Sequence, residues 1–321
     1  MDRALRLLAL IALSLLCACG PRGGKKAPDA SGPREFPRAE IPSMYTDAPE
    51  RAAYAAGHFW DRFTDTTRVY ACDSTTVNGV PLASVEAQMG LFASLLGQVS
   101  LDEGGKAVAR LYDRVDAFER KYPDSNVFEE LGRLARHYLY DPNSPVRNED
   151  LYGEFVSRLG KSDLIDSGYR MGYEWDARMC RLNRVGTKAA DFAFTDTRGW
   201  IRTLYSIKAA YTVLIFGNPG CKACREIMEA MADTPEIAAL IDDGRLQVVD
   251  VYIDREIDDW KAHIADYPKN WINGYDHKYA IRTELIYNVR GIPSIYLLDR
   301  DKTVLMKDAP QENVLEALIN L

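Results

Sequence analysis

A short apolar run followed directly by two closely spaced cysteines is the feature that most constrains this chain of 321 residues. Residues 211–216 are a continuous series of β-branched and aromatic side chains, which is typical of a central strand buried on both faces. A turn at residues 217–220 ends this strand, and Cys221 and Cys224 follow it. Residues 225–231 favour helix, so Cys221 is predicted to lie at a helix N-terminus.

That position has chemical consequences for the two thiols. The free backbone N–H groups and the positive end of the helix dipole stabilise a thiolate, and Lys222 adds positive charge, so we expect the pKa of Cys221 to be lowered. Cys224, one turn into the helix, could then attack a mixed disulfide formed by Cys221. A structural zinc half-site or a static disulfide is an alternative interpretation of the pair. Zinc would need two more ligands, and no histidine neighbours the motif.

The elements around the cysteines predict an α/β domain. A hairpin precedes the strand, and a strand–helix–strand alternation follows it, which implies a parallel crossover. A proline, Pro293, stands directly before another strand, where it cannot donate to a β-ladder and marks a special backbone position. The predicted segments are the hairpin 191–200, helices after 234 and over 254–263, strands 246–253, 294–298 and 303–306, and an amphipathic helix 310–321.

This order of elements resembles a thioredoxin-fold domain over about residues 186–321, with a central mixed sheet flanked by helices. The leading hairpin and a long insert between Val251 and Gly291 make it most similar to the TlpA-like thiol:disulfide oxidoreductases, which work outside the cytoplasm. The resemblance implies that Pro293 is a cis-proline facing the cysteines. It also implies reduction of protein disulfides with no cofactor beyond the redox-active disulfide Cys221–Cys224. The partners would then be protein disulfide or thiol clients and an electron donor in the membrane or periplasm.

The chain departs from the family pattern where a proton must be moved. The Trp that commonly precedes the first cysteine is Gly220, and the buried acid of cytoplasmic thioredoxins falls on Ile215. The Glu that often sits three residues beyond the second cysteine in TlpA-like proteins falls on Ile227. Glu226 and Glu284 remain as candidates for proton transfer.

These departures keep other functions open. One alternative is a redox-inactive lipoprotein that uses a thioredoxin scaffold only for binding or assembly. A peroxidase ranks third, because it needs an activating Thr/Arg setting that residues 218–220 do not offer. The reductase stays the first hypothesis.

Residues 48–185 predict an all-α helical domain of unknown function. Apolar residues recur at helical spacing, and prolines break the pattern near residues 123 and 142–145, which suggests about six helices. We interpret the aromatic residues of this part as core, not as a peptide groove: Tyr54, Phe59, Trp60, Phe63, Tyr112, Phe118, Tyr138, Tyr152 and Trp175. The single residues Cys72 and Cys180 could form a structural disulfide in an oxidising compartment.

Three segments extend the resemblance beyond the thioredoxin-like part. Residues 138–145, 183–187 and 270–273 resemble a Bacteroidetes lipoprotein family that joins an uncharacterised helical domain to a thioredoxin domain. That likeness implies an architecture and a compartment but no known substrate.

The N-terminal residues have the pattern of a targeting signal. Residues 1–18 have a basic start, an apolar run and a short cleavage region, as in a secretory signal peptide, and the residues before Cys19 resemble the lipobox of bacterial lipoproteins. Cleavage would leave Cys19 lipidated and the protein held on a membrane by its lipid anchor. Residues 19–47 are rich in Pro and Gly and predict a flexible tether. We expect a cell-envelope protein that faces the periplasm.

The charged residues and histidines of the chain limit the classes of partner that it can bind. The chain has 40 Lys and Arg against 47 Asp and Glu, a net charge of −7, so it has no basic excess to neutralise a nucleic-acid backbone. Its four histidines leave little material for a histidine-built metal site. We therefore expect neither nucleic acid nor a metal.

Overall fold

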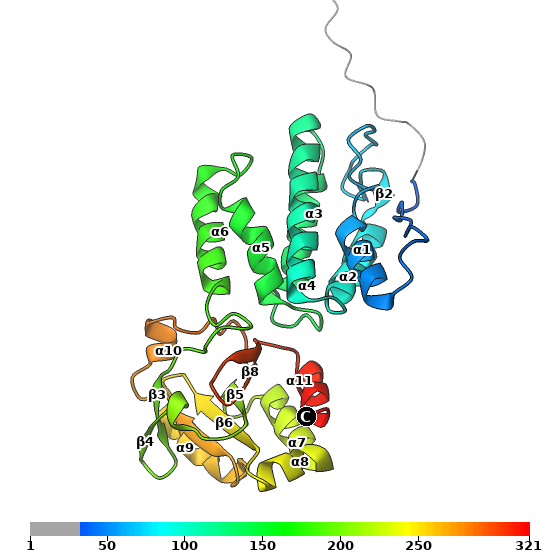
Figure 1. Cartoon of the computed structure of the whole chain (residues 1–321). Helices are drawn as coiled ribbons and strands as arrows, with labels where there is room; N and C mark the ends of the chain where they lie inside the picture. The colour runs from blue at the N-terminus through cyan, green and yellow to red at the C-terminus, as the bar shows by residue number, and fades with distance from the viewer. Residues whose placement is uncertain (1–32) are drawn as a thin grey trace, which may run out of the picture.

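The computed structural model describes residues 33–321, which form a helical domain above an α/β domain (Figure 1). The predicted signal peptide, residues 1–18, and the lipidation site Cys19 lie outside the described residues. Within the described part, the structure has no helix that is both long and apolar enough to cross a membrane.

Six helices build the described helical domain, and several begin at side chains of the types that cap helices. Ser100 accepts a hydrogen bond from Glu103 N at 3.2 Å, and Asn148 accepts one from Leu151 N at 3.1 Å. A two-strand hairpin is the one β element here. The bounds are α1 (Ala48–His58), β1 (Thr76–Val77), β2 (Val80–Pro81), α2 (Leu82–Leu96), α3 (Leu101–Lys121), α4 (Val127–Leu139), α5 (Glu149–Leu159) and α6 (Ser167–Cys180).

The aromatic residues of this domain lie mainly in its core. Trp60, Phe63, Phe118 and Tyr152 are buried, as their helical spacing predicted. Trp175 is the exception: it is 45% exposed on α6, with the guanidinium of Arg178 4.3 Å from its ring. The prediction that Trp175 belongs to the core is therefore wrong, because α6 packs one face on α5 and leaves this side chain on the other.

Part of the predicted tether is packed against the helical domain. Arg34 Nε donates to Asn78 O at 2.9 Å, and its guanidinium lies 3.9 Å from the ring of Tyr70. Phe36 stacks on Phe63 with a centroid distance of 5.3 Å. The prediction of a flexible tether over 19–47 is therefore wrong for residues that the structure describes, because Arg34 and Phe36, together with Glu40 and Tyr45, contact the helical domain.

The second domain is a seven-stranded mixed sheet in the order β4-β3-β7-β6-β5-β8-β9. Strands β5, β6 and β7 are parallel, and β8 is antiparallel to β5. The bounds are β3 (Ala193–Asp196), β4 (Ile201–Thr203), η1 (Leu204–Ser206), β5 (Tyr211–Gly217), α7 (Lys222–Asp233), α8 (Pro235–Asp242), β6 (Leu246–Tyr252), α9 (Ile257–His263), η2 (Ile264–Asp266), β7 (Ile272–Tyr275), α10 (Ala280–Thr283), β8 (Ser294–Leu298), β9 (Val304–Met306) and α11 (Gln311–Ile319).

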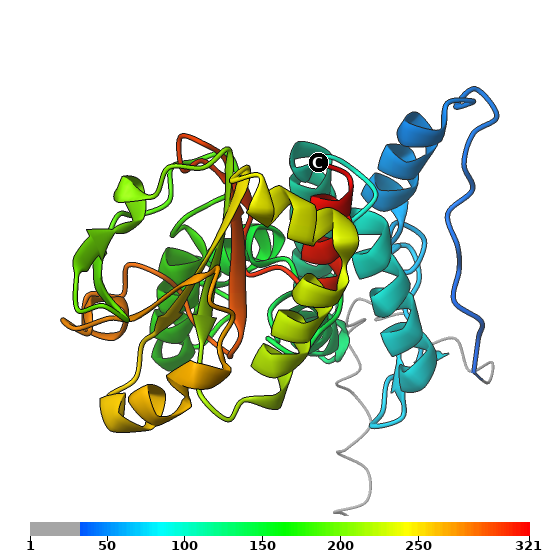
Figure 2. The same cartoon turned by 90° about the horizontal axis from the view of Figure 1, so that it is seen from below.

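Two apolar cores cover the two faces of this sheet. Side chains of α7, α8 and α11 pack on one face, where Ile227, Leu240 and Val314 meet Val213 and Ile215 of β5. The other face is covered by the segment before β5 and by α10 and Tyr287. Figure 2 shows α7, α8 and α11 in yellow and red on one side of the sheet.

The insert between β6 and β8 contains a strand that its sequence did not predict. Strand β7 has only four residues and includes Asn273 and Gly274, which are poor strand formers. Gly274 is needed because a β-carbon there would lie 2.6 Å from the ring of Phe194 on β3. The pairing of β7 with its neighbours therefore depends on tertiary packing that periodicity does not reveal.

A buried charge cluster joins the two domains. Lys307, just after β9, donates to Asp150 Oδ1 at 3.1 Å and to Cys180 O at 2.7 Å, and lies 3.3 Å from Glu149 Oε1. Glu149 is 2% exposed and stands in the first turn of α5, where the helix dipole favours negative charge. Burial raises the pKa of Glu149, which the charges of Lys307 and Arg290 oppose.

Replacing Lys307 by Met should destabilise the protein strongly. The change removes the nearest cation from two buried carboxylates, and breaking a buried ion pair in this way costs roughly 3–5 kcal/mol. Urea unfolding followed by circular dichroism measures the loss. Lys106→Met is the matched control, since Lys106 pairs with Asp102 and Glu103 on the surface and should leave the midpoint nearly unchanged. Equal effects of the two variants would contradict the assigned role of the cluster.

Candidate redox site

Cys221 is the N-cap residue of α7 and lies at the end of the turn that follows strand β5. Its sulfur accepts a hydrogen bond from Cys224 N at 3.2 Å, so the first turn of the helix points an N–H group at the sulfur. The thiol also lies 3.8 Å from the carbonyl oxygen of Ile292, to which it donates. The peptide bond between Ile292 and Pro293 is cis, as the family resemblance implied. The structure therefore brings Cys221, Cys224 and the Pro293 loop together.

The two thiols have different environments. Cys221 is partly exposed, whereas Cys224 is 3% exposed beneath it. Burial raises the pKa of the Cys224 thiol well above its ordinary value, and the hydrogen bond with Cys221 and the charge of Asp250 act in the same direction. Cys224 is thus a protonated thiol at neutral pH and needs a base before it can act as a nucleophile.

The strand next to β5 holds a buried carboxyl group, that of Asp250, which the sequence analysis did not single out. Asp250 stands on β6, directly opposite Ile215 of β5 in the parallel register, and is 3% exposed. Burial raises the pKa of Asp250 to about 7. Its ionised and protonated forms are therefore both populated at neutral pH, which suits a group that accepts and returns a proton.

Gly217 makes room for this carboxyl. A β-carbon at position 217 would lie 2.7 Å from Oδ1 and 2.9 Å from Oδ2 of Asp250, closer than any side chain tolerates. The last residue of β5 must therefore be glycine for the acid to sit beside the cysteine helix.

The signal for Asp250 was present in the sequence. Residues 246–253 form an apolar, β-branched run that predicts a buried strand, and Asp250 is the one charged residue inside it. An isolated acid in such a run either finds a partner or changes its pKa. In cytoplasmic thioredoxins the buried acid occupies the position of Ile215. In this chain the acid is Asp250, which lies on the neighbouring strand and on the same face of the sheet.

The structure places neither Glu226 nor Glu284, the two candidates for proton transfer, in the buried part of the site. Glu226 lies on the outer face of α7 and pairs with Lys222 at 3.0 Å, and Glu284 is exposed after α10. Proximity in sequence placed Glu226 near the cysteines, but the helical period turns it away from Cys224.

Two further contacts shape the site. Tyr267, from the insert after β6, is buried, and burial together with the charges of Asp250 and the two cysteines raises its pKa. Near the surface, Asp254 accepts hydrogen bonds from Asn218 Nδ2 at 3.1 Å and from Arg282 Nη2 at 3.0 Å. The loop before Cys221 is thereby tied to α10.

The other two cysteines among residues 33–321 are free thiols. Cys72 lies beside β1, with its sulfur 3.7 Å from Tyr70 O, whereas Cys180 is buried at the end of α6 against Gly153. These places are on opposite flanks of the helical domain (Figure 1), so the structure does not contain the disulfide that the sequence left open. Among residues 33–321, no group of three or more His, Cys, Asp or Glu side chains is arranged to hold a metal ion.

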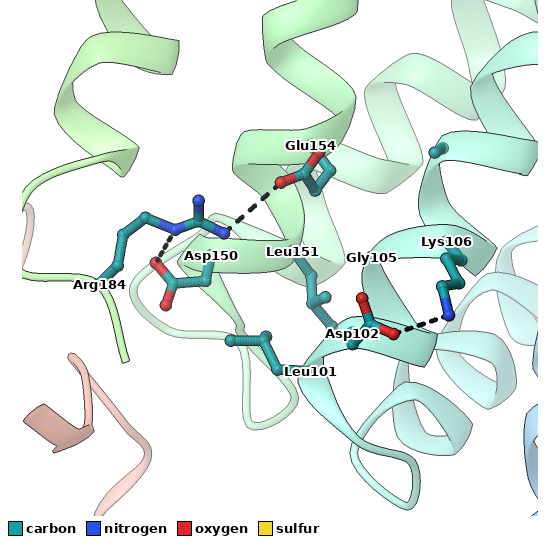
Figure 3. A pocket seen from close by; sticks show the side chains of 9 residues that line it. Leu101, Asp102, Gly105, Lys106, Asp150, Leu151, Glu154 and Arg184 are labelled. Atoms are coloured by element: carbon teal, nitrogen blue, oxygen red, sulfur yellow. Dashed lines mark ion pairs between the residues drawn. The ribbon is translucent and has the colours of Figure 1, made fainter. Parts of the chain in front are cut away.

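A pocket of about 430 Å³ lies between α3 and α5, away from the cysteines (Figure 3). The charged groups on its wall are largely paired with one another. Arg184 lies 3.5 Å from Glu154 and 3.9 Å from Asp150, and Lys106 pairs with Asp102 at 2.7 Å. These pairs make the pocket part of the domain packing.

Comparison with known proteins places this fold in a recognised class. The fold matches that of a thioredoxin-like protein from Bacteroides caccae with a TM-score of 0.77 and 32% identity, over 89% of this chain and 99% of that chain. A C-terminal domain of an uncharacterized protein from Bacteroides fragilis is 44% identical, with a TM-score of 0.41 over 42% of this chain and 97% of its own. The thioredoxin domain of a thiol-disulfide oxidoreductase from Bacteroides vulgatus is 25% identical, with a TM-score of 0.38 over 43% of this chain and 99% of its own.

The chain is thus a thioredoxin-like protein with an all-helical N-terminal region. A family model described as a domain of unknown function, DUF5106, matches residues 18–179, and the chain belongs to that family. A search of the curated proteins found no match.

The free energy of unfolding should depend on pH because of the titration of Asp250. Between about pH 4 and pH 7 the unfolded carboxyl is ionised while the buried one keeps its proton, so the folded state binds more protons. Stability then falls as the pH rises through this window, by at most about 1.4 kcal/mol per pH unit, and the penalty is constant above it. Asp250→Asn removes this titration and should gain on the wild type as the pH rises.

Urea unfolding at several pH values between 5 and 8 measures this difference. Asp113→Asn is the control, because Asp113 is 63% exposed and pairs only at the surface with Arg158. A gap between wild type and Asp250→Asn that stays constant over the whole range would show that the carboxyl titrates normally.

Proposed function

We propose that this chain is a thiol:disulfide oxidoreductase that reduces protein disulfides through Cys221 and Cys224. The observation that carries the proposal is the pairing of a partly exposed Cys221, at a helix N-cap and beside the Ile292 carbonyl, with a buried Cys224 and a buried acid. Fold likeness alone would not separate a reductase from a binding scaffold. The charge of Asp250 acts on the inner thiol, which favours a reactive pair over a static disulfide or a scaffold.

The chemistry runs in two exchanges that balance. The thiolate of Cys221 attacks one sulfur of a client disulfide, forms a mixed disulfide and releases the other client sulfur as a thiolate. Cys224 then passes its proton to the ionised Asp250 and attacks Cys221 Sγ. This forms the Cys221–Cys224 disulfide and expels the second client thiolate. Two electrons pass from the protein to the client, and a dithiol donor must return them for the next cycle.

The cellular setting is part of the same proposal. Lipidation at Cys19 after removal of residues 1–18 would hold the protein on a membrane, facing the periplasm, where disulfides form and persist. The partners there are proteins that carry disulfides and a membrane or periplasmic electron donor. The support is the signal-like sequence before Cys19.

Trapping of clients tests the catalytic roles. Cys224→Ser should accumulate mixed disulfides between Cys221 and client proteins, because the resolving thiol is gone, and Cys221→Ser should accumulate none. Non-reducing electrophoresis of the variants, followed by reduction, counts the adducts. Cys72→Ser is the control and should behave as wild type. Equal absence of adducts in both active-site variants would favour the redox-inactive binding module.

The direction of electron flow is tested by the reduction potential of the Cys221–Cys224 pair. Equilibration in defined thiol buffers, with Cys72→Ser and Cys180→Ala to remove the other described thiols, should give a value close to that of thioredoxin, about −270 mV. A value near about −120 mV would mark an oxidant instead. If the two cysteines are not oxidised and reduced reversibly at any potential, the chain is not a thiol:disulfide oxidoreductase.

A further inference from the structure

The loop that carries Pro293 is held by the helical domain. Before the proline, Asn288 Nδ2 donates to Glu149 Oε1 at 2.8 Å and lies 3.3 Å from the hydroxyl of Tyr140. The guanidinium of Arg290 lies 4.0 Å from the centre of the Tyr140 ring. Glu149 and Tyr140 belong to the helical domain, so this side of the loop has its contacts across the domain boundary.

The segment after the proline is tied to the same place. Ser294 Oγ and Arg290 Nη2 both donate to the carboxylate of Asp308, each at 2.7 Å. Arg147, from the loop between α4 and α5, donates to the carbonyl oxygens of Asp308 and Ala309 at 2.8 and 2.9 Å. Asp308 is 3% exposed, so these bonds are made away from water, where they are strongest.

One contact lies next to the redox site itself. A β-carbon built on Gly291 would lie 2.8 Å from Cβ and 3.3 Å from Cγ of Pro142 in the α4–α5 loop. Gly291 therefore touches the helical domain, while its neighbour Ile292 presents the carbonyl that faces Cys221 Sγ. Two consecutive residues, Gly291 and Ile292, thus connect the α4–α5 loop to the reacting sulfur.

We propose that the helical domain is a positioning element of the redox site: Pro142 and Tyr140 set the place of loop 288–294, and through it the surface that a client polypeptide meets beside Cys221. This inference rests on the proposed function and deepens it. The helical domain then affects the rate at which protein disulfides are reduced, because these clients must pair with that loop. It has much less effect on small reagents, which need only the sulfur of Cys221. Pro142 and Tyr140 are positioning residues and do not touch the client.

A double-mutant cycle across the boundary tests the contact. Gly291→Ala places a methyl group against Pro142, and Pro142→Gly removes the atoms that it meets. In the reduced full chain, Gly291→Ala should slow the single-turnover reduction of a peptide with one disulfide by about tenfold or more, as small misplacements do. Adding Pro142→Gly should restore the rate to within about threefold of wild type. Tyr140→Leu, which removes the ring under Arg290, should slow the same reaction without any new clash.

A second readout separates positioning from a general loss of structure. Alkylation of Cys221 by iodoacetamide needs no client surface and should change by no more than about twofold in all these variants. Gly57→Ala, at a helical glycine with open space around it, is the control and should match wild type in both assays.

Three results would overturn the inference: an unchanged peptide rate in Gly291→Ala, no recovery in the double variant, or equal losses of peptide reduction and alkylation. A wild-type chain that alkylates normally but reduces no disulfide would instead overturn the proposed function. The two failures are therefore distinguishable in the same experiment.

Discussion

The burial of ionised side chains between two domains is the constraint on which the rest of this molecule depends. Lys307, Arg290 and Arg147 come together with the buried carboxylates of Glu149, Asp150 and Asp308. Each of these charges would be costly to bury alone, and each has an opposite charge within 4 Å, in most pairs across the domain boundary. The helical domain and the sheet therefore offset part of each other's charge, and the junction is formed by residues from both.

The redox site is built at the edge of that junction. Cys221 stands between the end of β5 and the start of α7, and the carbonyl that it faces belongs to a loop that also contacts the helical domain. Beneath the surface, Asp250 fills the space left by Gly217 and lies near the inner thiol. The outer part of the site is thus shaped by the domain contact and the inner part by the register of two parallel strands.

Local patterns predicted much of the fold. The apolar run 211–216, the Cys-x-x-Cys pair and the proline before β8 are short-range signals, and the elements that they predict are present. The failures were long-range. The Arg and Phe that dock residues 33–47 are unremarkable in sequence, and β7 pairs through Gly274 packing under Phe194 and not through its own β propensity. The exposed position of Trp175 depends on how α6 packs against α5.

By itself, the sequence determined which residues can carry thiol chemistry, because a strand, a turn and a helix start are set by neighbouring residues and place Cys221 at a helix N-terminus. Only the tertiary structure decided which acid accompanies them. Asp250 is 26 residues beyond Cys224 along the chain and reaches it through the pairing of β6 with β5, whereas Glu226 is two residues away and points outward. The same holds for the contact between Pro142 and Gly291, since a distance between residues far apart in sequence is set by packing and charge pairing that no local pattern encodes.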